Sequence, residues 1–282
     1  MSWISYAQNG EDVLLRRAFV DVPAGFYIDV GACDPVDLSV TKTFYDQGWS
    51  GINIEASPTQ WTIVAAGRKR DLNLNVGCSN RHGKTTFFQA KGGATGLSTF
   101  AAEEAEKHEK AGFKFERIET PLTTLVDICT EHVGDRTIDF IKIDVEGHER
   151  EVLEGGDFRR WRPRVVLIEA TRPLSQESTH QRWEHLLLGA DYVYATFDGL
   201  NRYYVRKEDE ALVARLLTPP NVFDDYVPYA HQRRIDALQA ELDAYRRSHA
   251  IVSSAVRTAR LLHKTASWIG ARVTAPIRRF AR

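Results

Sequence analysis

The stretch Asp139-Phe-Ile-Lys-Ile-Asp-Val-Glu-Gly-His-Glu149 combines an apolar run with three charged residues at alternate positions, Lys142, Asp144 and Glu146. Alternate side chains of a strand share one face, and a central parallel strand is normally apolar on both faces. A lysine in such a strand is costly unless it is paired. We therefore expect Lys142 and Asp144 to form a polar site at the carboxyl end of a central strand, or an ion pair that only fixes that end. Glu146 either joins them, lies exposed or caps the next helix.

Similar apolar runs alternate with helix-like segments over most of the first 206 residues. We predict strands at 25–31, 51–55, 72–76, 138–144, 164–170, 192–197 and 202–205, with a further hairpin strand at 84–89. We predict helices at 38–47, 59–66, 101–110, 122–132, 149–153 and 181–188. Strands that alternate with short helices are typical of an α/β fold with a parallel sheet. The turn Asp198-Gly-Leu-Asn201 between the last two strands predicts one antiparallel hairpin at its end.

The first predicted strand ends in Asp29-Val-Gly31, and the second ends in Glu55. A carboxylate, a glycine and a tight turn at that place are typical of a nucleotide-like ligand site in an α/β sheet. The GxGxxG loop that lets the backbone approach a dinucleotide pyrophosphate is absent. Glu55 is placed to accept hydrogen bonds from both hydroxyls of a ribose. These features favour S-adenosylmethionine, which has a ribose and no phosphate, over NAD.

Four stretches together resemble the FkbM-type S-adenosylmethionine-dependent methyltransferases. They are Ser5-Tyr-Ala-Gln-Asn-Gly-Glu-Asp-Val-Leu14, Phe26-Tyr-Ile-Asp-Val-Gly31, Phe140-Ile-Lys-Ile-Asp-Val-Glu-Gly147 and Arg164-Val-Val-Leu-Ile-Glu169. The resemblance extends over about 5–226, and its later parts, at 173–184, 197–204 and 220–225, are similar to the branch associated with polysaccharide and glycan clusters. It implies a Rossmann-like, seven-stranded methyltransferase sheet, mostly parallel with one antiparallel hairpin strand.

The resemblance also implies O-methyl transfer and a set of cofactor contacts. These contacts are Asp29, Gly31 and Glu55, with Gln8 and Glu11 nearby, and we add Asp144 and Glu146 at the end of the fourth strand. The family commonly has asparagine where this chain has Cys33, a change that we expect to loosen one hydrogen bond.

A methyltransferase acting on a sugar needs a group that takes up the hydroxyl proton. Candidates are Asp144, Glu169 and His180, and we favour His180 because its unperturbed pKa lies near physiological pH. Lys142 belongs to the same predicted catalytic group. Asp144, Glu169 and Asp198, with Asn201, could instead bind Mg²⁺, which prefers oxygen ligands. Ser98, Asp198 and Asn201 are candidate contacts to the substrate, although Ser98 could simply cap a helix.

Composition and charge narrow the class of protein. The 282 residues are 43% hydrophobic and 27% charged, with a formal net charge of −1, which disfavours a nucleic-acid-coating protein. Residues 231–282 carry 11 basic and 3 acidic side chains, a net charge of +8, whereas the first 230 residues carry −9. Three widely spaced cysteines favour a reducing compartment. With no secretory signal or apolar span in the sequence, we expect a cytoplasmic protein.

The basic segment predicts one long helix, so we expect a methyltransferase domain at 1–228 and a helical tail at 229–282. Residues of a heptad seam recur at alternating steps of three and four, at Ile235, Leu238, Leu242, Tyr245, His249, Val252, Val256 and Ala259, and His249 and the small residues weaken it. This heptad pattern suits a homo-oligomeric coiled coil, and the basic amphipathic character suits an anionic membrane surface such as the inner face of the membrane. A solvated or partly disordered tail remains a third interpretation.

The sequence therefore predicts methyl transfer to a sugar hydroxyl of a glycan, polysaccharide or glycolipid intermediate, with a lipid-linked saccharide as acceptor. One alternative is O-methylation of a polyketide, peptide or small metabolite. Another is a non-catalytic S-adenosylmethionine-binding module in a membrane-associated assembly.

Overall fold

The computed structural model describes residues 3–273, with side chains described through residue 249 and at 258, 260 and 261. Within it the chain divides into two compact units, one ending at Tyr229 and the other beginning at Ala230. All the strands and the shorter helices belong to the first unit.

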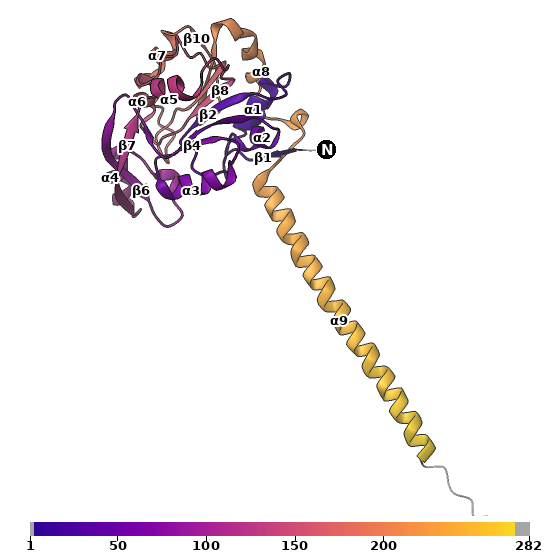
Figure 1. Ribbon diagram of the computed structural model, residues 1–282. Helices are drawn as coiled ribbons and strands as arrows, with labels where there is room; N and C mark the ends of the chain where they lie inside the picture. The colour runs from indigo at the N-terminus through magenta and orange to yellow at the C-terminus, as the bar shows by residue number, and fades with distance from the viewer. Residues whose placement is uncertain (1–2, 274–282) are drawn as a thin grey trace, which may run out of the picture. The chain divides into compact units, whose positions relative to one another are not determined.

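The first unit is built on a seven-stranded sheet in the order β10-β11-β9-β8-β2-β3-β4 (Figure 1). Its strands are β2 (Phe26–Val30), β3 (Ser50–Ile54), β4 (Leu72–Leu74), β8 (Phe140–Ile143), β9 (Val165–Glu169), β10 (Tyr192–Phe197) and β11 (Asn201–Arg206). The strands from β4 to β9 in this order are parallel, and β11 pairs antiparallel with both β9 and β10. The predicted mixed α/β class is confirmed, and each of the seven strands predicted for this sheet is present with its ends shifted by no more than two residues.

Two apolar layers enclose the central strands because successive side chains of a strand point to opposite faces. Tyr27, Phe140 and Leu167 belong to the core on one face of the sheet. Their chain neighbours Ile28, Ile141 and Val166 belong to the core on the other face. A strand that is buried on both faces reads as a continuous apolar run, which is why β2, β8 and β9 were recognisable in the sequence.

Helices connect the parallel strands and flank the sheet. They are α1 (Glu11–Ala18), α2 (Lys42–Asp46), α3 (Pro58–Gly67), α4 (Ala102–Lys110), α5 (Leu125–His132), α6 (Glu149–Glu154), α7 (Glu184–Leu188) and α8 (Val213–Leu216). Short 3₁₀ turns are η1 (Thr95–Leu97), η2 (His180–Arg182), η3 (Lys207–Leu212) and η4 (Val222–Asp224). Helix α1 was not predicted as a helix from the sequence.

Three predicted helices were too long, each for a local reason. Leu38 has a positive φ of 58°, so α2 begins only at Lys42. Thr124 caps α5 by accepting a hydrogen bond from the Asp127 backbone, and the residues before it belong to β7. The helix predicted at 181–188 is divided at Trp183, whose backbone leaves the helical region.

A second, three-stranded sheet has the order β5-β7-β6. Its strands are β5 (Gly77–Cys78), β6 (Gly83–Ala90) and β7 (Phe115–Thr123), and η1 and α4 lie in the connection between β6 and β7. The sequence indicated β6 but not β7, which has no apolar run and in which four of the nine residues are exposed. A short parallel pair, β1 (Trp3–Ser5) with β12 (Tyr226–Pro228), joins the two ends of the first unit.

The second unit contains helix α9 (Tyr229–Val273). Four apolar side chains of the predicted heptad are substantially exposed, Ile235, Leu238, Leu242 and Tyr245. The side chains of Val252, Val256 and Ala259, which continue the predicted heptad, lie outside those described. Across residues 3–273, none of the helices combines the length and the apolarity needed to cross a bilayer.

Candidate active site

A pocket of about 340 Å³ lies at the carboxyl ends of β2, β3 and β8. This is the edge at which open α/β sheets bind their ligands, because the parallel strands all end there. Eight of the predicted site residues line it, namely Gln8, Asp29, Gly31, Glu55, Ser98, Lys142, Asp144 and Glu146. Residues separated by more than a hundred positions in the sequence therefore meet in one cavity.

Lys142 links the ends of β2 and β8 at the base of this pocket. Its Nζ donates a hydrogen bond to the Gly31 carbonyl oxygen at 2.8 Å, and lies 3.4 Å from Asp29 Oδ1 and 3.3 Å from Asp144 Oδ2. Burial lowers the pKa of Lys142, but the Asp144 and Asp29 carboxylates outweigh it and raise the pKa above its usual value. The buried ammonium therefore stays charged and holds the two carboxylates on either side of it.

Asp29 and Gly31 are fixed by their surroundings. Asp29 is only 2% exposed, and its Oδ2 accepts a hydrogen bond from Thr41 Oγ1 at 2.9 Å, whereas Oδ1 has no hydrogen-bond partner. Gly31 has a φ of 82°, and a Cβ at this position would lie 1.9 Å from the Asp144 carbonyl oxygen. Both the positive φ and the close approach of the backbone require glycine.

Glu55 organises the turn that follows β2. Its Oε2 accepts a hydrogen bond from the Cys33 backbone at 2.9 Å, and its Oε1 accepts one from the Ser57 backbone at 2.7 Å. Burial raises the pKa of Glu55, although these two backbone donors oppose the shift. A carboxylate offers about four acceptor positions, so two remain for a ligand in the pocket.

Cys33 has a φ of 50°, in the left-handed region. Asparagine tolerates that region better than most residues, so the left-handed backbone suits the asparagine that the resemblance implies at this position. Burial raises the pKa of the Cys33 thiol to about 11, so the side chain is a neutral packing group.

The connection between β6 and α4 forms another wall of the pocket through Gly93, Thr95, Gly96 and Phe100. Ser98 holds this connection together, because its hydroxyl donates to the Thr95 carbonyl at 2.7 Å and accepts from the Ala90 backbone at 3.0 Å. Ser98 therefore acts on the shape of the wall, with its donor already engaged.

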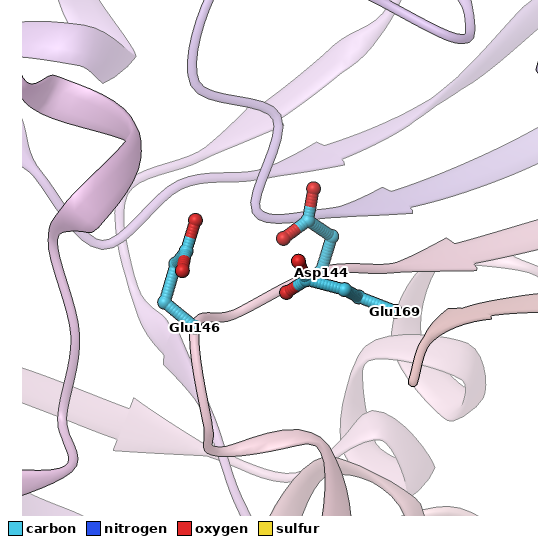
Figure 2. A group of neighbouring side chains, drawn as sticks. All are labelled: Asp144, Glu146 and Glu169. Atoms are coloured by element: carbon cyan, nitrogen blue, oxygen red, sulfur yellow. The ribbon is translucent and has the colours of Figure 1, made fainter. Parts of the chain in front are cut away.

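Asp144, Glu146 and Glu169 form a group of three carboxylates beside the pocket (Figure 2). Asp144 follows β8, Glu169 ends the neighbouring strand β9, and one oxygen from each of the three lies within 4.8 Å of the others. Burial, followed by the charge of Asp144, raises the pKa of both Glu146 and Glu169 well above the usual value. This group is able to hold a proton or a cation.

Asp198 and Asn201, predicted at the substrate or metal site, lie elsewhere and do not line the pocket. Asp198 Oδ1 accepts from the backbones of Leu200 and Asn201 in the β10–β11 turn, and its Oδ2 accepts from Tyr203 Oη at 2.8 Å. The turn uses both oxygens, which is why the acidic group contains Glu146 in place of Asp198.

Glu11 also lies outside the pocket lining, in contact with this turn. Its Oε1 accepts from Asn201 Nδ2 at 2.9 Å, and its Oε2 accepts from the Asn9 backbone at 2.7 Å. Glu11 therefore joins the start of α1 to the β10–β11 hairpin, and of the two residues predicted nearby only Gln8 reaches the pocket.

His180, the favoured base, lies in η2 and is not among the residues that line the pocket. Its Nδ1 is 2.5 Å from Ser178 Oγ, and its Nε2 is 3.9 Å from Glu184. Burial, followed by the charge of Arg202, lowers the pKa of His180, although Glu184 opposes the shift.

The sequence analysis did not mark the pocket-lining Asp34 and Asp37, nor two residues that support the site, Thr41 and Glu149. Thr41 binds Asp29, and Glu149 accepts hydrogen bonds through Oε1 from the backbones of Val145 and Gly147, at 3.2 and 3.0 Å. An acidic residue in the first turn of a helix is a recognisable signal for such a role, and it applies to Glu149. No local signal marks Thr41, because its partner lies in another element.

We expect Lys142→Met to lower the free energy of unfolding by about 3–5 kcal/mol, because Asp29 would remain as a buried charge without its partner. The double variant Lys142→Met/Asp29→Asn should recover part of the loss. Denaturant unfolding measures both, with the exposed Lys84→Met as control. A Lys142→Met protein as stable as the wild type would contradict this account of the site.

We also expect Glu11 to make stability depend on pH. Burial raises the pKa of Glu11 from 4.5 to about 7, so between these values the folded chain binds a proton that the unfolded chain has lost. The contribution is complete below the unfolded pKa and is lost as the pH rises through about 7. As the pH rises from about 5 to 8, the free energy of unfolding of Glu11→Gln should increase by up to about 3 kcal/mol relative to that of the wild type. If the free energy of unfolding depended on pH in the same way in both proteins, this prediction would be wrong. The exposed Glu131→Gln serves as control.

Comparison with known proteins agrees with this geometry. The Methyltransferase FkbM domain matches residues 29–194, from Asp29 at the pocket to Tyr194 in β10, which is more than half of the chain. No curated protein matches the chain. The matched segment contains the Lys142 cluster and the three grouped carboxylates, whereas the motif at 5–14 lies outside it. The chain therefore belongs to the FkbM methyltransferase family.

Proposed function

We propose that this protein transfers a methyl group from S-adenosylmethionine to a hydroxyl oxygen of a sugar in a glycan, polysaccharide or glycolipid intermediate. The charge of the pocket is the observation that carries the cofactor assignment. Among the described residues that line the pocket, Lys142 is the only cation against six carboxylates, Asp29, Asp34, Asp37, Glu55, Asp144 and Glu146. Such a lining attracts a cationic sulfonium and repels the pyrophosphate of NAD.

The residues present fit this cofactor. A volume of about 340 Å³ lies within the ~300–1,000 Å³ of small-molecule sites. Glu55 keeps acceptor capacity for ribose hydroxyls, and the side chain of Gln8 supplies a further polar contact. Gly31 keeps the backbone at the end of β2 free of a side chain.

The chemistry requires little beyond alignment and removal of one proton. When bound, S-adenosylmethionine supplies a methyl group on a sulfonium whose sulfur keeps the bonding electron pair. The acceptor oxygen forms the new bond with its own lone pair, and its proton passes to a carboxylate of the protein. Such a base typically contributes about 10²–10⁴-fold. We assign this role to the Asp144, Glu146 and Glu169 group in preference to His180, because two of its members line the pocket.

The sugar acceptor rests on the similarity of 173–184, 197–204 and 220–225 to the polysaccharide-associated branch of the family. A polyketide, peptide or small-metabolite acceptor is the alternative, and it predicts turnover on soluble acceptors without α9. A non-catalytic binding module would bind cofactor without turnover. The intact Asp29, Glu55 and Asp144 favour an enzyme.

We expect the purified protein to bind S-adenosylmethionine and S-adenosylhomocysteine in isothermal titration, and not to bind NAD⁺. Glu55→Ala should weaken the binding of both ligands by about 100-fold or more, as expected for the loss of two hydrogen bonds to a charged group. The exposed Glu131→Ala should bind as the wild type does. If neither S-adenosylmethionine nor S-adenosylhomocysteine bound, or if NAD⁺ bound instead, the proposed function would be refuted.

We further propose that the protein acts in the cytoplasm at the inner face of the membrane, where α9 binds anionic lipid or associates with other copies of itself. The exposed apolar side chains from Ile235 to Tyr245 and the net charge of +8 over 231–282 support this role. An acceptor that is still attached to a lipid carrier would explain why an enzyme has such a helix.

A chain ending at Pro228 should lose sedimentation with anionic liposomes, and the full chain should lose it as salt screens the basic residues. Neutral liposomes are the control, and sedimentation equilibrium of both chains separates membrane binding from self-association. Equal liposome binding by the two chains would refute the membrane role.

A further inference from the structure

The three carboxylates beside the pocket have an unusual balance of charge. In the part of the chain that the structure describes, neither Glu146 nor Glu169 has an ion-pair partner, and Lys142 is shared among Asp144, Asp29 and the Gly31 carbonyl. One ammonium thus serves four carboxylates. Glu169 is the buried member of the three. A carboxylate buried without a counter-charge costs several kcal/mol, so a proton or a cation beside it would stabilise the group.

Glu169 is the carboxylate of the group that lacks a partner most clearly. Its side chain is 8% exposed, and its Oε2 is buried without a hydrogen-bond partner. Figure 2 shows the Glu169 carboxylate beside Asp144 with Glu146 across from them, and one oxygen of each residue lies within 4.8 Å of the others. Buried carboxylate oxygens normally have partners, so this one indicates an absent ligand.

Glu146 is held toward this space by its backbone. Its φ is 55° and that of Gly147 is 97°, a pair of left-handed residues. Thr99 Oγ1 donates to the Glu146 carbonyl at 2.7 Å, and Glu149 binds the backbone on both sides of Glu146. The carboxylate is therefore positioned before any ligand arrives.

We propose that Asp144, Glu146 and Glu169 bind a divalent cation such as Mg²⁺ or Mn²⁺. The ligands are carboxylate oxygens without histidine or cysteine, which suits hard cations and not Zn²⁺. Neighbouring oxygens around Mg²⁺ are about 3 Å apart and opposite ones about 4 Å. The observed separations of up to 4.8 Å therefore need only small side-chain rotations.

The position of this cation gives it a role in the proposed methyl transfer, on which this part of the inference rests. Asp144 and Glu146 line the pocket, so an open coordination position faces the bound acceptor. A sugar hydroxyl whose oxygen binds there has a lower pKa. Its proton passes to water or to a carboxylate of the group before the oxygen attacks the methyl group.

Direct cation binding tests the site without any need for turnover. Full-length protein freed of metal with a chelator is titrated with Mn²⁺ in the absence of S-adenosylmethionine, and bound Mn²⁺ is followed by electron paramagnetic resonance. We expect one tight site in the wild type. Glu169→Gln, which keeps the shape of the side chain, should weaken it by more than about tenfold, since loss of a ligand exceeds the effect of an outer partner. Glu131→Gln, exposed on α5, should leave it unchanged.

Thermal unfolding provides a second measurement that remains informative if one variant folds poorly. Mn²⁺ should raise the melting temperature of the wild type and of Glu131→Gln, and not that of Glu169→Gln or Glu146→Gln. A wild type that binds no Mn²⁺, while Glu169→Gln is more stable than the wild type, would overturn the proposal and show that the group shares a proton. Equal Mn²⁺ binding by all four proteins would also overturn it.

The same experiments separate this inference from the proposed function. Mn²⁺ binding at these carboxylates in a protein that does not bind S-adenosylmethionine would support the site and refute the methyl transfer. Methyl transfer that is unaffected by a chelator, in a protein that binds no Mn²⁺, would refute the site alone.

Discussion

The buried ammonium of Lys142 is the interaction on which the geometry of the site depends. The charge lies between Asp29 on β2 and Asp144 beyond β8, and it also binds the carbonyl of Gly31. Removing a lysine from water is expensive, and only two carboxylates and a carbonyl in the right places offset that cost. The ends of the two central strands are therefore held in register by electrostatics, in addition to the hydrogen bonds of the sheet.

Close packing of the backbone adds a second constraint at the same place. Gly31 passes so near the Asp144 carbonyl that no side chain fits between them. The turn after β2 must then continue through Cys33 in the left-handed region, and Glu55 holds it there through the Cys33 backbone N–H. Glu55 thus shapes the pocket as well as lining it, which couples the position of the turn to the ligand that its remaining lone pairs can bind.

Two groups of acidic residues in the first unit have different tasks. Glu11 and Asp198 have every oxygen engaged within the network that joins α1 to the β10–β11 hairpin. Glu146 and Glu169 lie in the other group, where one oxygen is buried and unbonded. The first arrangement is complete and stabilises the fold. In the second group a buried oxygen has no hydrogen-bond partner, as is expected of a site that binds a ligand.

The sequence by itself determined the α/β class, the strands of the central sheet and the residues of the Lys142 cluster, because continuous apolar runs and charges at alternate positions are local patterns. It failed for β7, whose charged and exposed residues have no apolar run, and for the start of α2 at Lys42. Only the tertiary structure decided that Glu146, and not Asp198, joins Asp144 and Glu169. The reason is physical: the β10–β11 turn uses the Asp198 oxygens, and competition between partners distant in sequence is settled only when the strands are packed together.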